Sequence, residues 1–70
     1  MHDICTYHIE VRGQVNENTL NAGSPLEMTV VRRDTATTLF TIRADQSGLI
    51  GLMRHLHGHG FVLSSVTRER

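Results

Sequence analysis

Three stretches of the chain alternate between apolar and polar residues, as β-strands with one buried face do. Residues 5–15 keep this two-residue rhythm, and residues 26–33 and 38–44 repeat it. Only the short polar segment 34–37 separates the last two stretches, so they are expected to pair as an antiparallel hairpin. The pattern therefore predicts three strands before residue 45.

The period changes after residue 44. Apolar side chains then recur at i, i+3, i+4 and i+7, which places them on one stripe of a helix: Leu49, Leu52, Met53 and Leu56. Asp45 is a residue type that caps helix N-termini, and Gly58 or Gly60 can end the helix in the left-handed conformation. Residues 61–67 are again rich in β-forming types and predict a final strand.

The segment Asn16–Pro25 follows neither period and is rich in Asn, Gly and Ser. It predicts a ten-residue loop with room for one short helical turn at 17–21. The expected fold is an α+β two-layer sandwich of one domain, residues 1–70. It has three or four antiparallel strands and one helix in the order βββαβ. Gly48 and Gly51 inside the helix are expected where its backbone packs closely on a strand.

One helix covers only one face of such a sheet. The opposite face is expected to carry a mixture of charged, hydroxyl and apolar side chains: His8, Glu10, Arg12, Glu27, Thr29, Val31, Arg33, Leu39, Thr41 and Arg43. This open face can be solvated, can pair with a second copy, or can hold a ligand. Its arginines can bind an anionic effector or form a charged seam between copies, whereas the simpler interpretation is cross-strand pairs of Arg and Glu.

Composition narrows the classes of function. The formal net charge is zero, which removes the positive field that nucleic acids or anionic lipid surfaces require. The chain has no long apolar run and no leader pattern, and its one cysteine, Cys5, cannot form an internal disulfide. We therefore expect a cytoplasmic protein with no membrane partner. A chain of 70 residues gains stability by association, so a homodimer is expected.

The histidines are the densest candidate chemistry. His55, His57 and His59 fall in the last part of the predicted helix, where His55 and His59 share one face and His57 lies on the other. Two imidazoles on one face can bind zinc, nickel or copper, with His8, His2 or a second copy completing the site. The other interpretation is imidazoles that lie in solvent and interact favourably with the helix dipole when charged.

No catalytic set is recognisable. Cys5 and His8 lie three apart on a strand and so face opposite ways, and Ser64 and Ser65 lack the surrounding glycines of a nucleophile elbow. Glycine-rich dinucleotide and phosphate-binding motifs are missing as well. We expect a protein that is not an enzyme and has no cofactor.

Several motifs resemble those of a family of small, largely uncharacterised bacterial proteins. The motifs are YHIEVRG at 7–13, TTL at 37–39, DQSGLIGLM at 45–53 and HGFVLSSV at 59–66. Members of that family carry a tryptophan-containing segment where this chain has residues 16–25, which hold no tryptophan. The family has no established activity, so the resemblance assigns no role to particular residues.

The helix that begins at Asp45 and the strand after Gly60 also resemble the second half of ACT-type regulatory domains. That resemblance implies a ferredoxin-like fold that pairs through its sheets and binds small effectors such as amino acids near the Asp-x-x-Gly turn. The candidate ligand-binding residues are therefore Asp45, Gln46 and Gly48 of the turn, with Arg12 and Arg43 of the open face. The alternative for Asp45 is helix capping alone.

The resulting hypothesis is a non-catalytic homodimeric module that binds a small ligand or a partner protein through its open sheet or the Asp45 turn. The alternative is a metal-binding accessory protein that uses the cluster His55, His57 and His59.

Overall fold

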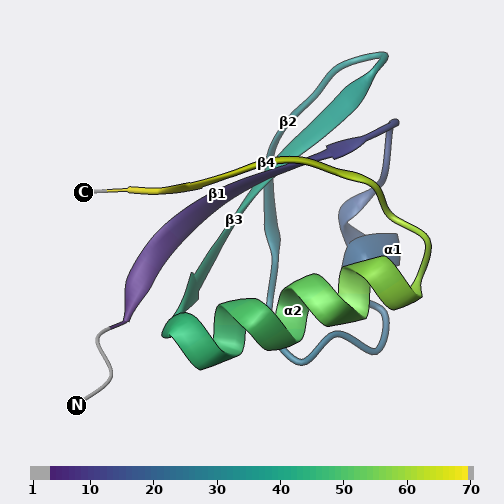
Figure 1. The fold of residues 1–70 in the computed structure, drawn as a ribbon. Coiled ribbons are helices and arrows are strands. Elements are labelled where there is room, and N and C mark those ends of the chain that lie inside the picture. The colour runs from purple at the N-terminus through teal and green to yellow at the C-terminus, as the bar shows by residue number, and fades with distance from the viewer. Residues whose placement is uncertain (1–3, 70) are drawn as a thin grey trace.

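A computed structural model describes residues 4–69 of the chain. Four strands form one antiparallel sheet in the order β2-β3-β1-β4 (Figure 1). The elements are β1 (Cys5–Arg12), α1 (Glu17–Asn21), β2 (Thr29–Arg33), β3 (Thr37–Ala44), α2 (Gln46–Gly58) and β4 (Leu63–Arg68). The predicted α+β fold with one main helix is confirmed. The short turn between the first two strands is a five-residue helix, so the full order is βαββαβ, the order of ferredoxin-like folds.

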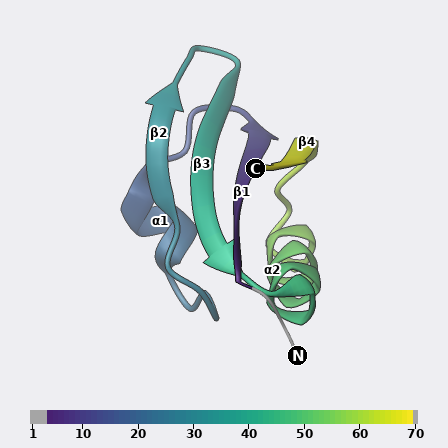
Figure 2. The same cartoon turned by 90° about the vertical axis from the view of Figure 1, so that its left-hand side faces the viewer.

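Both helices contribute to a single core on one face of the sheet. Figure 2 shows α1 beside β2 at one edge of the sheet and α2 at the other edge, below β4. Fully or almost fully buried apolar side chains come from both central strands, both helices and the segment before β2. They are Ile9, Val11, Leu20, Met28, Phe40, Ile42, Ala44, Leu52 and Leu56.

The predicted capping of α2 is present at both ends. The Asp45 carboxylate accepts a hydrogen bond from the Gly48 backbone N–H at 2.7 Å. At the other end Gly60 has φ +84°, and its N–H donates to the carbonyl of His57 while the N–H of Phe61 donates to the carbonyl of Leu56. These two bonds form a Schellman motif, which requires the left-handed residue that glycine supplies without strain.

The short helix α1 is held by a cap at its N-terminus and by one buried side chain. The Asn16 side chain caps it by accepting from the N–H of Thr19 at 2.7 Å. Its one fully buried side chain is Leu20, which joins the core. A helix this short is not stable by propensity alone, so packing of Leu20 must hold it in place.

The strands differ from their predicted bounds in length and in one register. β1 ends at Arg12 rather than at residue 15, and β2 begins at Thr29 rather than at residue 26. A bulge between Val30 and Arg32 shifts the pairing with β3, so that Arg33 lies opposite the buried Thr38. The prediction that Arg33 lies on the open face is therefore wrong, because the extra residue of the bulge reverses the parity of the rest of β2.

None of the helices within residues 4–69 has the length and apolar character needed to cross a membrane.

Candidate functional site

The open face of the sheet is built from the residues that alternate with the core positions of each strand. Thr29, Thr41, His8 and Thr67 form one cross-strand row, and Arg32, Leu39, Glu10 and Ser65 form the next. The His8 ring nitrogen Nε2 lies 3.2 Å from the Glu69 carboxylate at the margin of this face. Hydroxyl groups therefore make up half of these two rows, and the other positions hold charged, imidazole and apolar side chains.

A shallow hollow lies at one end of the open face. Two threonines of the central strands, Thr6 and Thr41, line it together with Thr29, Glu27 and Arg43. No ion pair joins Glu27 to Arg43 within residues 4–69. A carboxylate, a guanidinium and several hydroxyl groups therefore line the same small hollow.

The predicted ligand-binding residues do not all come together. Arg43 lies opposite Thr6 in the sheet, whereas Arg12 lies opposite Thr37 at the far end of the same strand pair. Six residues of extended chain separate these two positions, or about 20 Å. Arg12 and Arg43 share the open face, as predicted, but they cannot contact one small ligand.

Asp45 caps the N-terminus of α2, which was the alternative to a ligand-binding role in the sequence analysis. The Asp45 carboxylate is engaged by the Gly48 N–H, and Gln46 is exposed. A Cβ atom at Gly48 would lie 3.2 Å from the Ala44 Cβ, so the predicted close packing of the helix is present there. Around Gly51 there is open space, so the same prediction is wrong for that residue. A ligand role for Asp45, Gln46 and Gly48 stays a prediction.

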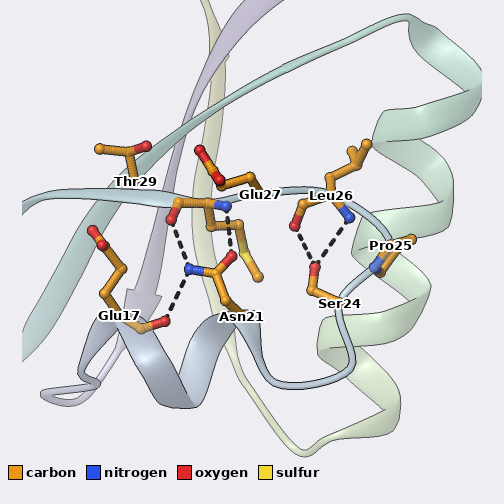
Figure 3. Close-up of a pocket in the computed structure, with 8 residues that line it drawn as sticks. Glu17, Asn21, Ser24, Pro25, Leu26, Glu27 and Thr29 are labelled. Atoms are coloured by element: carbon orange, nitrogen blue, oxygen red, sulfur yellow. Dashed lines mark hydrogen bonds between the residues drawn. The ribbon is translucent and has the colours of Figure 1, made fainter.

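The β2 edge of the sheet is covered by side chains of α1. The Asn21 side chain donates to the carbonyl of Met28 at 2.9 Å and accepts from its N–H at 2.7 Å (Figure 3). The Glu17 carboxylate accepts from the N–H of Val30 at 2.8 Å. These side chains occupy the backbone groups that a neighbouring strand would otherwise use, which is one way proteins protect sheet edges.

No side chain among residues 4–69 covers the β4 edge in this way. The N–H of Glu69 donates inward to the carbonyl of Thr6 at 2.8 Å, and alternate residues of a strand direct their backbone groups to opposite edges. The backbone groups of Val66 and Arg68 therefore lie on the outer side of β4. Across the described part of the chain, no hydrogen bond is made to those outer groups.

An apolar groove runs beside this free edge, between α2 and β4. It is lined by Ile50, Met53, Arg54, His57, Gly58 and Leu63. Ile50 and Val66 keep 45% and 37% of their surface exposed, which is a large fraction for apolar residues at the edge of a core. Sequence reasoning missed this groove because Ile50 falls outside the predicted apolar stripe, although an isoleucine on the polar side of a helix was an available signal.

The histidines divide between three places. The rings of His55 and His59 lie side by side with centroids 4.2 Å apart, as the helical spacing predicts. His57 lines the groove on the other side of α2, and His8 lies on the open face next to Glu69. His2 lies outside the described residues. Within residues 4–69 no group of three or more His, Cys, Asp or Glu side chains is placed to hold a metal ion.

The fold and these surfaces define a small α+β module with one protected and one free sheet edge. Residues 6–67 match the family described as Domain of unknown function (DUF8691), so the chain belongs to this family. No curated protein and no solved structure matches the chain significantly.

Proposed function

We propose that this protein is a non-catalytic module that acts as a homodimer joined along β4 and binds a small ligand or a partner protein on its open face. The observation that carries the proposal is the difference between the two edges of the sheet. α1 side chains occupy backbone groups of β2 and of Met28 just before it, whereas the outer backbone groups of β4 face outward beside an apolar groove. A protected edge and a free edge in one sheet favour one defined contact between copies over open-ended stacking.

Pairing of β4 with a second copy about a two-fold axis at Val66 fits the sequence of the strand. The outer N–H and C=O groups of the two Val66 residues would bond to each other, and Ser65 would lie opposite Thr67 of the second copy. The two Arg68 side chains would each face Ser64 of the other copy, so no like charges would oppose each other. A net charge of zero adds no long-range repulsion between copies.

The same pairing would cover apolar surface. The two α2 helices would approach each other across the axis, and exposed groups such as Ile50 and Val66 would lie near their counterparts. For a chain with a core of this size, apolar area buried between copies is a substantial share of the total. This is the physical reason to choose a second copy as the occupant of the groove.

The open face is then left for a ligand or partner. The hollow lined by Thr6, Glu27, Thr41 and Arg43 suits a small polar molecule that carries both a negative and a positive group, because Arg43 can receive the first and Glu27 the second. A binding role rather than a catalytic one is supported by Cys5, whose side chain points to the face opposite His8.

The experiment that tests the dimer is size-exclusion chromatography with light scattering on the full chain. We expect a dimer at high micromolar concentration, and a clean monomer there would overturn the proposal. Val66→Lys should give a monomer, because two ammonium groups would oppose each other at the axis. Val31→Lys is the matched control. Val31 is 58% exposed near the protected β2 edge, so this variant should remain dimeric.

Ligand binding is tested separately by NMR. A panel of free amino acids is titrated into ¹⁵N-labelled protein, and we expect shifts to gather at Thr6, Thr41 and Arg43. Arg43→Gln should abolish these shifts, whereas Arg12→Gln, on the same face but about 20 Å away, should leave them unchanged. Shifts confined to Asp45–Gly48 would instead place the ligand at the helix turn.

A further inference from the structure

His55 and His59 form a pair at the end of α2 that lies outside both the open face of the sheet and the apolar groove. Their ring centroids are 4.2 Å apart and their planes are inclined by 40°. Imidazole nitrogens bind transition metals at about 2.0–2.1 Å, which places two neighbouring ligand nitrogens about 3 Å apart on one ion. Two histidines at i and i+4 on one face of a helix have the spacing with which metal sites in proteins hold zinc.

The ring of His59 is already oriented by a hydrogen bond. Its Nδ1 lies 2.9 Å from the backbone carbonyl oxygen of His55. A carbonyl oxygen only accepts, so Nδ1 must carry the proton, and in the neutral ring Nε2 then holds a lone pair that points away from the backbone. The same bond, from the second ring nitrogen to a backbone carbonyl, fixes the tautomer and orientation of histidines in metal sites.

The helix end holds the backbone of the pair as well. The N–H of His59 donates to the carbonyls of His55 and Leu56, and the Schellman motif at Gly60 closes the turn directly after it. His59 is therefore held within a hydrogen-bonded turn and does not belong to a frayed end. The ring of His59 is therefore oriented before any ion arrives, which lowers the entropy lost on binding.

We propose that His55 and His59 form a two-histidine chelate for a divalent transition-metal ion, with Cu²⁺ held more tightly than Ni²⁺ or Zn²⁺. Imidazole nitrogens suit all three ions, and the order follows the general ranking of their affinities for nitrogen ligands. Within residues 4–69 no third acidic, cysteine or histidine side chain joins the pair. The remaining coordination positions are filled by water or by a ligand from outside the chain.

His57 provides an internal control. It lies on the same turn of α2 but lines the groove on the other side of the helix, with Met53 and Leu63. A general attraction of metal ions to exposed histidines would involve all three residues alike. The chelate involves His55 and His59 and leaves His57 out.

The test is isothermal titration of tag-free protein, stripped with EDTA and dialysed, with CuCl₂, NiCl₂ and ZnCl₂. Each variant and its parent carry His2→Gln, so that the imidazole of His2 does not compete for the ion, and the chain without this substitution is titrated in parallel. We expect one ion per chain. His55→Gln and His59→Gln should each weaken Cu²⁺ binding at least tenfold, and His57→Gln should leave it unchanged.

A second measurement distinguishes binding from damage to the fold. Electron paramagnetic resonance of the Cu²⁺ complex should show two equivalent nitrogen ligands, and these should fall to one in His59→Gln. Circular dichroism should show the helix intact in every variant. The proposal is overturned if His59→Gln binds as tightly as its parent, or if His57→Gln weakens binding as much as His55→Gln does. Dimerisation is measured in EDTA, so its outcome is independent of this result.

Discussion

Several polar side chains form hydrogen bonds to backbone N–H and C=O groups that have no partner within the sheet or the helices. The hydroxyl of Thr38 lies fully buried and bridges two backbone groups, accepting from the N–H of Val15 at 2.9 Å and donating to the carbonyl of Gly13 at 2.8 Å. Asp45 bonds in the same way to the first turn of α2, and Asn21 bonds to Met28 just before β2. Buried backbone groups cost free energy when unpaired, so these side chains fix where the loops lie.

Thr38→Val should destabilise the fold by about 1–3 kcal/mol, because valine keeps the shape of the side chain but leaves the Val15 N–H and the Gly13 carbonyl unpaired. Urea unfolding followed by circular dichroism measures the change. Thr41→Val on the open face is the control and should change stability by less than about 0.5 kcal/mol. Equal effects of the two variants would show that the buried hydroxyl bridge contributes nothing.

For single residues, the sequence predicts the face of a strand or helix on which a side chain lies better than it predicts which residues that side chain contacts. The helical spacing placed His55 beside His59, and the strand period placed Arg12 and Arg43 on one face. Neither period says how far along a strand two residues lie after pairing, so the separation of Arg12 from Arg43 needed the register. The hydrogen bond from the His59 ring to the His55 carbonyl could not be predicted from any sequence pattern.

At the scale of elements, α2 contains two internal glycines with different surroundings. A Cβ at Gly48 would lie 3.2 Å from both the Ala44 Cβ and an Asp45 carboxylate oxygen, whereas a Cβ at Gly51 would meet nothing within 4 Å. Glycine in the interior of a helix weakens it by about 1 kcal/mol relative to alanine. Only at Gly48 does close packing offset that cost.

Gly51→Ala should therefore stabilise the protein by about 0.5–1 kcal/mol, since it restores helix propensity without a clash. Gly48→Ala should be neutral or destabilising, because the new methyl group must displace the chain at Ala44 and disturb the Asp45 cap. Thermal unfolding of both variants beside the parent protein measures the difference. A gain at Gly48 equal to that at Gly51 would contradict the packing argument.

Element types followed from the sequence because each stretch keeps one period over most of its length. The change at Ala44 from a two-residue to a helical rhythm marked the start of α2, and the segment 17–21 was placed as a short helical turn. The bulge near Val31 was not visible, because a bulge depends on which residues face each other across two strands. The adjacent residues Val30 and Val31 are equally compatible with a regular strand in which one valine is exposed.

At the scale of the whole molecule, the order β2-β3-β1-β4 decides which strands are edges, and no local pattern carries that information. β1, the first strand in sequence, is central, and β4, the last, is free on one side. The asymmetry of the edges depends on α1, since Asn21 bonds to the backbone of Met28 just before β2 and Glu17 bonds to Val30 within it. Removal of that cover should change how copies associate as well as how stable one copy is.

Asn21→Ala should cost about 1–3 kcal/mol, because the N–H and carbonyl of Met28 lose their partner. Adding Glu17→Ala frees the N–H of Val30 as well, so the two substitutions together should open the second edge of the sheet. With both edges free, we expect assemblies larger than a dimer at high concentration, measured by light scattering. Asn18→Ala, in the same helix and exposed, should behave like the parent protein. Adding Val66→Lys to these two substitutions leaves only the β2 edge free, so association should stop at a dimer, since two identical edges related by a two-fold axis close on themselves. Growth beyond a dimer in this triple variant would show that the copies join through a surface other than the sheet edges.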